Sequence, residues 1–165
     1  MLNRKSKQSA PLISTNLKAF LDMIAFSEIG PKLLTFSDNG YNVIVGGGRF
    51  LKYDDHPRQL VNIKCNGRVI RSTAAGRYQI LAHIFDSYKK LLKLPDFGKD
   101  SQDRIAIQLI KECKAIEDIE AGRFADAVYK CRSRWASLPG AGYDQHENDL
   151  RDLHAAYTRS GGKTL

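Results

Sequence analysis

The chain has 165 residues, 27% of them charged, and a formal net charge of +8. This length fits one domain with a core large enough to fold without disulfides or a structural metal. The positive charge favours polyanionic partners (nucleic acid, an anionic membrane or a cell wall) without selecting among them. The Lys and Arg residues are scattered rather than clustered, and no nucleic-acid-binding module is recognisable, so we expect no nucleic-acid partner.

The cysteines and histidines do not form a metal-binding pattern. Cys65, Cys113 and Cys131 are odd in number and widely spaced, and the last two continue apolar helical faces, as core thiols do. The four histidines are dispersed, and neither a CxxC nor an HExxH motif occurs. We therefore predict no metal and no cofactor.

The N-terminal segment, residues 1–13, is basic and polar and is predicted to be a disordered tail before one domain at 14–165. The apolar stretch that follows contains Lys18 and Asp22. It is too broken for a signal peptide and too short to span a bilayer. The sequence thus predicts a protein made in the cytoplasm without stable membrane insertion. Since no exposed heptad seam is present, we expect a monomer.

A helix ending in a single carboxylate follows the tail. Apolar residues recur at helical spacing at Leu17, Phe20, Leu21, Ile24 and Ala25, and Gly30-Pro31 ends the pattern. Glu28 lies four residues after Ile24 and so continues the buried face. Desolvation and the negative end of the helix dipole both raise the pKa of such a carboxyl group, which can then act as a proton donor near neutral pH. The alternative is a helix-end Glu that turns to solvent or pairs with an Arg.

Beyond this helix the pattern changes to short strands and then back to helices. Residues 60–65 and 68–71 flank Asn66-Gly67, which predicts a β-hairpin. Short β-type runs are also predicted at residues 41–45 and 49–53, on either side of three glycines at 46–48. No Lys-Ser/Thr follows these glycines, so they indicate a turn rather than a phosphate loop. Helical stripes then cover about 78–92, 105–116, 124–135 and 150–157. This order predicts an α+β, lysozyme-like fold in which a cleft separates a small antiparallel sheet lobe from a mostly helical lobe.

Five blocks, in the same order from about residue 20 onward, resemble the lambdoid and P2-type phage endolysins. The blocks are residues 20–28, 40–47, 53–58, 72–79 and 135–143. The resemblance implies a lytic transglycosylase that cuts peptidoglycan between N-acetylmuramic acid (MurNAc) and N-acetylglucosamine (GlcNAc). Glu28 would first protonate the glycosidic oxygen and then act as base toward the primary hydroxyl of MurNAc, which closes an anhydro ring. No carboxylate nucleophile is needed for this reaction.

Two other functions remain open at this point. A muramidase on the same fold would use water and a second carboxylate, for which Asp38, Asp54 and Asp55 are candidates. A non-catalytic cationic protein would act on the wall through charge alone.

The resemblance also suggests six residues that bind the glycan: Asn42, His56, Arg77, Tyr78, Gln79 and Tyr143. Several have a structural alternative. Tyr143 would otherwise pack in a surface loop, Tyr78 fits a buried helical stripe, and Arg77 could pair with an acidic neighbour. His56 would otherwise be a turn residue bonded to a nearby Asp.

The sequence departs from the family at two positions. The relatives carry Asp at the position of Asn42 and usually Gly at that of Ile29, so both the charge near the cleft and the loop over the site differ here. With no export signal, the protein would stay in the host cytoplasm until a holin-like membrane lesion admits it to the periplasm, where it would cause lysis.

Overall fold

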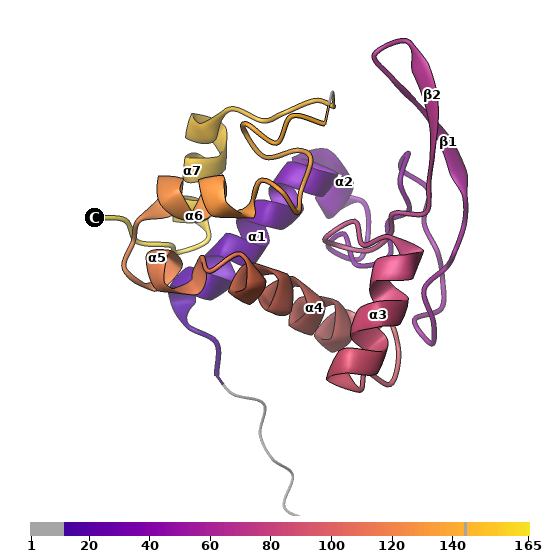
Figure 1. Ribbon diagram of the computed structural model, residues 1–165, viewed down its shortest axis with the longest axis horizontal. Coiled ribbons are helices and arrows are strands. Elements are labelled where there is room, and N and C mark those ends of the chain that lie inside the picture. Colours follow the sequence, from indigo (N-terminus) through magenta and orange to yellow (C-terminus); the bar gives the residue numbers. More distant parts are fainter. Residues whose placement is uncertain (1–11, 144) are drawn as a thin grey trace, which may run out of the picture.

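The computed structural model describes residues 12–143 and 145–165, which form seven helices and one two-stranded antiparallel hairpin (Figure 1). The elements in chain order are α1 (Thr15–Ile29), α2 (Pro31–Thr35), β1 (Val61–Cys65), β2 (Arg68–Ser72), α3 (Ala82–Leu92), α4 (Lys99–Glu112), α5 (Ile116–Glu120), α6 (Phe124–Cys131) and α7 (Leu150–Arg159). This architecture confirms the predicted α+β class. Most of the predicted tail, residues 1–11, lies outside the described residues.

Helix α1 is the central element of the helical lobe and packs against α2, α4, α5 and α7 (Figure 1). It begins at Ser14, whose side chain caps the helix by accepting a hydrogen bond from the Leu17 amide. Phe20 is fully buried and meets the rings of Phe124 and Tyr157 edge-on. Gly30 ends the helix with a φ of 80°, a conformation that glycine adopts without strain. Packing on several sides holds the end of α1, and with it Glu28, in a fixed place.

The hairpin stands away from the helical lobe in Figure 1. Val61 pairs with Ser72 and Cys65 with Arg68, and Asn66 and Gly67 form the turn with positive φ, as the sequence predicts. The predicted runs at 41–45 and 49–53 make only isolated bridges, such as Val43 with Arg49. The glycine turn between them folds the chain back at once, so no continuous ladder forms.

The segment before α3 is not helical, although the apolar spacing predicts a helix from about residue 78. Gly76 and Gln79 both have positive φ, which a right-handed helix does not allow. Gly76 is also closely packed: a Cβ there would lie 2.2 Å from Oε1 of Gln102. Helix α3 begins only at Ala82, whose amide donates to the hydroxyl of Thr73. The turn brings Tyr78 into the core by tertiary packing rather than by helix periodicity.

The remaining helices complete the core, with two differences from the sequence prediction. A short helix, α5, follows α4, and α6 ends at Cys131 instead of reaching Trp135. Trp135 is nevertheless buried, as expected, and its Nε1 donates to the Tyr78 carbonyl. Cys131 is buried and Cys113 packs against the same cluster. None of the described helices is both long enough and apolar enough to cross a bilayer.

Candidate active site

Glu28 lies in the last turn of α1, where its part-exposed side chain is closely surrounded by protein atoms. The hydroxyl of Ser137 donates to Oε1 of Glu28 at 2.5 Å, and the Ser137 backbone amide bonds to the same carboxyl group. Burial raises the pKa of Glu28 to about 7, and the two bonds from Ser137 partly oppose this shift. Among the described residues no Lys or Arg forms an ion pair with Glu28, so the alternative of an Arg-paired glutamate does not apply. The site holds a carboxylic acid that titrates near neutral pH.

Two further side chains surround the Glu28–Ser137 bond. The hydroxyl of Ser27 lies 2.7 Å from that of Ser137. Nδ2 of Asn148 donates to both the hydroxyl and the carbonyl of Ser27, at 3.0 and 3.1 Å. The Asn148 backbone amide donates to the Ser137 carbonyl at 2.8 Å. The loop between α6 and α7 is thereby tied to the end of α1.

Sequence reasoning missed all three of these partners. Ser27 directly precedes Glu28, and Ser137 falls inside one of the five matching blocks, so both could have been noticed. Asn148 had no local signal, since it lies 121 residues from its partner Ser27.

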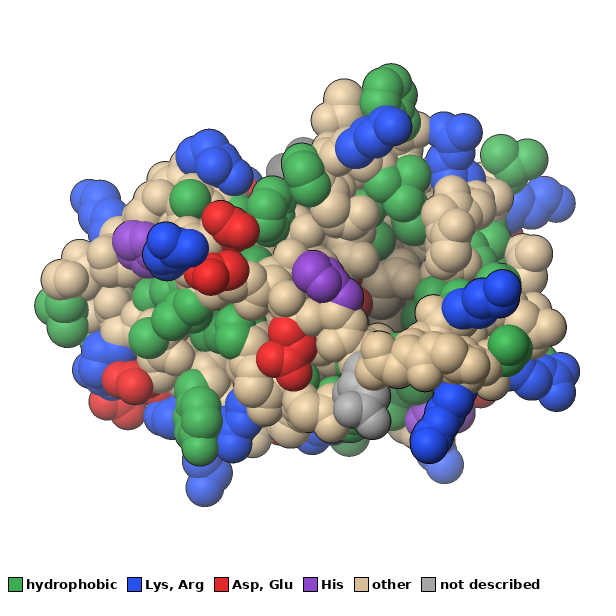
Figure 2. Space-filling view, turned by 90° about the horizontal axis from the view of Figure 1, so that it is seen from above, with side chains coloured by type: hydrophobic (Ala, Val, Ile, Leu, Met, Phe, Trp, Pro, Cys, Tyr) green, Lys and Arg blue, Asp and Glu red, His purple; other side chains and the backbone are tan. Residues whose placement is uncertain are grey.

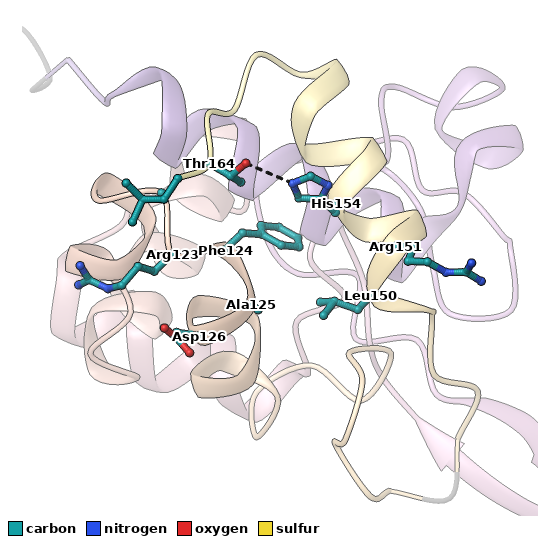
Figure 3. A pocket seen from close by; sticks show the side chains of 10 residues that line it. Arg123, Phe124, Ala125, Asp126, Leu150, Arg151, His154 and Thr164 are labelled. Atoms are coloured by element: carbon teal, nitrogen blue, oxygen red, sulfur yellow. Dashed lines mark hydrogen bonds between the residues drawn. The ribbon is translucent and has the colours of Figure 1, made fainter.

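The molecular surface is hollowed between two raised parts in the view of Figure 2. A depression of about 250 Å³ begins at Ile29 and Gly30, next to Glu28 in the chain. A separate cavity of about 580 Å³, drawn in Figure 3, lies between α6, α7 and the C-terminal residues, around Phe124, Leu150 and His154. It includes none of the predicted site residues, so the chemistry of Glu28, not cavity size, identifies the candidate site.

Two of the three carboxylates proposed as second catalytic groups are engaged elsewhere. Asp38 accepts hydrogen bonds from Lys99 and Tyr53, both at 2.7 Å, and these lower its pKa. Hydrogen bonds from Arg58 likewise lower the pKa of Asp55. Asp54 is exposed. Within the described part of the chain, none of the three shares a hydrogen bond with Glu28.

Three of the six predicted glycan-binding residues belong to the core, which corrects the sequence interpretation, and the first two are Arg77 and Tyr78. Arg77 is 4% exposed, and its guanidinium bonds to the Asp22 carboxylate and the Asn39 carbonyl, each at 2.6 Å. Tyr78 is 2% exposed and donates to Asp103. Their structural alternatives, an acidic pair for Arg77 and core packing for Tyr78, were the correct ones.

His56 is likewise a core residue and not part of the cleft lining. Its Nδ1 accepts from the Arg58 amide, so the ring proton lies on Nε2, which donates to the Ile80 carbonyl at 2.8 Å. The ring packs on Phe85 and Phe97, and burial lowers its pKa. The imidazole is therefore neutral and structural, and its bonds go to the backbone rather than to an Asp side chain.

The other three residues retain some surface, and their hydrogen bonds go to groups other than Glu28. Asn42 is part-exposed and accepts from the Asp38 amide. Gln79 is part-exposed and donates to the Gly76 carbonyl at 2.9 Å. Tyr143 is 52% exposed, and its hydroxyl donates to the Ser133 carbonyl rather than pointing at the acid. In the described ranges, no three His, Cys, Asp or Glu side chains are grouped to hold a metal ion.

Comparison with known proteins gives consistent matches over nearly the whole chain. The Endolysin family model matches residues 18–164. The endolysin of Escherichia phage lambda is 46% identical over 91% of this chain and 94% of its own length, and that of Escherichia phage P2 is 47% identical over 92% and 98%. The solved structure of bacteriophage lambda lysozyme complexed with a chitohexasaccharide superposes with a TM-score of 0.88 at 43% identity, over 94% of this chain and all of that one.

Proposed function

Because the chain belongs to the endolysin family, we propose that it cuts the glycan strands of peptidoglycan as a lytic transglycosylase, with Glu28 as the single acid–base residue. The broader activity follows from the family: the protein is a lysozyme-like enzyme that degrades the bacterial cell wall. The observation that carries the finer proposal is the desolvated Glu28 carboxyl group, with a pKa of about 7 and no second carboxylate bonded to it in the described structure.

In the proposed reaction, protonated Glu28 gives its proton to the oxygen between MurNAc and GlcNAc as the bond from that oxygen to the anomeric carbon of MurNAc breaks. The primary hydroxyl of the same MurNAc then bonds to the anomeric carbon and passes its proton to the Glu28 carboxylate. Glu28 is thereby regenerated, a GlcNAc hydroxyl is released, and no water is consumed. A pKa near the working pH suits both steps, because one group must first give a proton and then take one.

A hydrolytic muramidase is the alternative reaction at the same site. It would benefit from a second carboxylate to stabilise the sugar cation or to activate water. The engagement of Asp38 by Lys99 and Tyr53, and of Asp55 by Arg58, favours the mechanism that needs only one.

We further propose that the glycan strand runs past the Glu28 carboxyl group, with Asn42, Gln79 and Tyr143 as the remaining candidate contacts. The lambda lysozyme structure contains a chitohexasaccharide, which supports an extended sugar ligand here. A monomer that leaves the host cytoplasm through a holin-dependent lesion and acts in the periplasm fits this substrate.

Mass analysis of fragments from purified peptidoglycan tests the proposal. The wild-type enzyme should release fragments ending in anhydro-MurNAc, whereas reducing MurNAc ends would indicate the hydrolase. Glu28→Gln should lower the rate at least about 10²-fold, the usual contribution of a general acid. Glu117→Gln, which removes an equal charge from a side chain that is 90% exposed, should leave the rate unchanged. Wild-type cleavage by Glu28→Gln would reject Glu28 as the proton donor.

A further inference from the structure

We propose that Ser137, Ser27 and Asn148 are positioning residues for the acid–base reaction, forming a one-way chain of hydrogen bonds that holds the Glu28 carboxyl group in a single orientation. This inference rests on the proposed function of Glu28. It adds three residues that lie outside the expected glycan-binding set, and it assigns each of them a donor and an acceptor.

The direction of the chain follows from counting protons. A serine hydroxyl has one proton to donate, and the charged Glu28 carboxylate can only accept, so in that form of the site the Ser137 proton is given to Oε1 of Glu28. In the 2.7 Å contact between the two serines, Ser137 must therefore accept and Ser27 must donate. Ser27 then accepts from Nδ2 of Asn148 at 3.0 Å. All the protons in the chain point toward the carboxyl group.

The hydrogen-bond chain starts at Asn148, because the flipped orientation of the Asn148 side-chain amide is unfavourable. Nδ2 faces three oxygen acceptors: the hydroxyl and carbonyl of Ser27 and, at 3.3 Å, the carbonyl of Ser137. Rotating the amide would place its own oxygen against two backbone carbonyls, which repel it. The donor end of Asn148 is thus directed at Ser27.

Hydrogen bonds within the loop that carries Ser137 hold this loop in place, so the hydrogen-bond chain to Glu28 has little freedom to rearrange. The Glu147 carboxylate accepts from the backbone amides of Gly140 and Gly142, at 2.8 and 2.9 Å. The Asn148 backbone amide adds its bond to the Ser137 carbonyl. These bonds close the loop between Ser137 and Asn148 and present the Ser137 hydroxyl to Glu28 as a preorganised donor.

Charged neighbours do not provide another explanation for the pKa of Glu28. The described ionisable side chains on the elements around the end of α1 lie on α2, in the loop between α6 and α7, and on α7. They are Lys32, Arg132, Arg134, Tyr143, His146, Glu147, Asp149, Arg151, Asp152, His154, Tyr157 and Arg159. Glu147 and Asp149 bond to loop amides and to Arg151, and Arg159 lies over the Phe26 ring. None of these side chains contributes to the pKa of Glu28, which depends on burial and on Ser137. This hydrogen-bond chain therefore provides the polar interactions that counteract the effect of burial on the pKa of Glu28.

The test measures the Glu28 titration directly, by carboxyl-carbon NMR, together with the pH profile of glycan cleavage. In Ser137→Ala the carboxylate loses a hydrogen bond that stabilises its charged form, so its pKa should rise by about one unit. The alkaline limb of activity should move to higher pH by the same amount. At the optimum kcat should fall several-fold while KM stays constant, because the carboxyl group is no longer held in place. Ser133→Ala, which removes an exposed hydroxyl from the same region, is the matched control and should change neither readout.

Ser27→Ala provides a second and gentler perturbation within a helix. It removes the donor to Ser137 but not Ser137 itself, so the Glu28 pKa should rise in the same direction by a smaller amount. An unchanged Glu28 pKa in either folded variant would overturn the proposal of a hydrogen-bond chain to Glu28. If Glu28→Gln is inactive while these variants keep the wild-type titration, only the positioning inference fails. If Glu28→Gln stays active, the proposed function fails instead. The NMR titration of the serine variants still tests the proposed hydrogen-bond chain.

Discussion

Replacing Glu28 by glutamine should stabilise the protein at alkaline pH. The pKa of this group is about 7 in the folded protein and 4.5 for an ordinary glutamate. Between these values the native state keeps a proton that the unfolded chain has lost, so the wild-type free energy of unfolding falls by about 1.4 kcal/mol for each pH unit. The loss is absent below the unfolded pKa and reaches about 3 kcal/mol above the folded one. Glutamine carries no charge at any of these pH values and avoids the loss.

Urea unfolding of the wild type and Glu28→Gln, at about pH 5 and about pH 8, measures this effect. The stability advantage of the variant should grow by about 2–3 kcal/mol between the two conditions. Glu117→Gln serves as the control for removing one negative charge, and its difference from wild type should stay nearly constant. A pH-independent difference for Glu28→Gln would mean that the carboxyl group is solvated in the native state. The argument for a proton donor would then lose its physical basis.

Three other changes test the packing around the site. Asp22→Asn leaves the buried guanidinium of Arg77 without its carboxylate and should cost about 2–4 kcal/mol in chemical denaturation; a loss below 1 kcal/mol would mean that the pair is solvated. Gly76→Ala should destabilise more than Gly67→Ala by about 1–3 kcal/mol, because both have positive φ but only the first Cβ meets a buried side chain. Equal melting temperatures would contradict this. A neighbouring thiol and a nearby Arg lower the pKa of Cys113, so iodoacetamide at neutral pH should modify it before the buried cysteine, as peptide mass mapping would reveal.

The helix that carries Glu28 shows how much of the structure a local sequence pattern can predict. Neighbouring residues predict its apolar spacing and its Gly30-Pro31 end, and the structure confirms both. The Asn66-Gly67 hairpin was predictable for the same reason, since a two-residue turn depends on local φ preferences.

The same kind of pattern failed where the chain turns inside the core. Tyr78 continues an apolar stripe, yet positive φ at Gly76 and Gln79 keeps it out of a helix. Arg77 and His56 looked like ligand contacts because they are polar residues in matching blocks. Each is satisfied internally by partners that the sequence does not place beside it.

The sequence by itself determined the α+β order and the helix that carries Glu28, because periodicity and helix ends depend on residues a few positions apart. Only the tertiary structure decided which groups meet the acid. Ser137 and Asn148 approach the end of α1 across more than 100 residues of intervening chain. Contacts of that separation arise from how the helices pack, and no local preference encodes them.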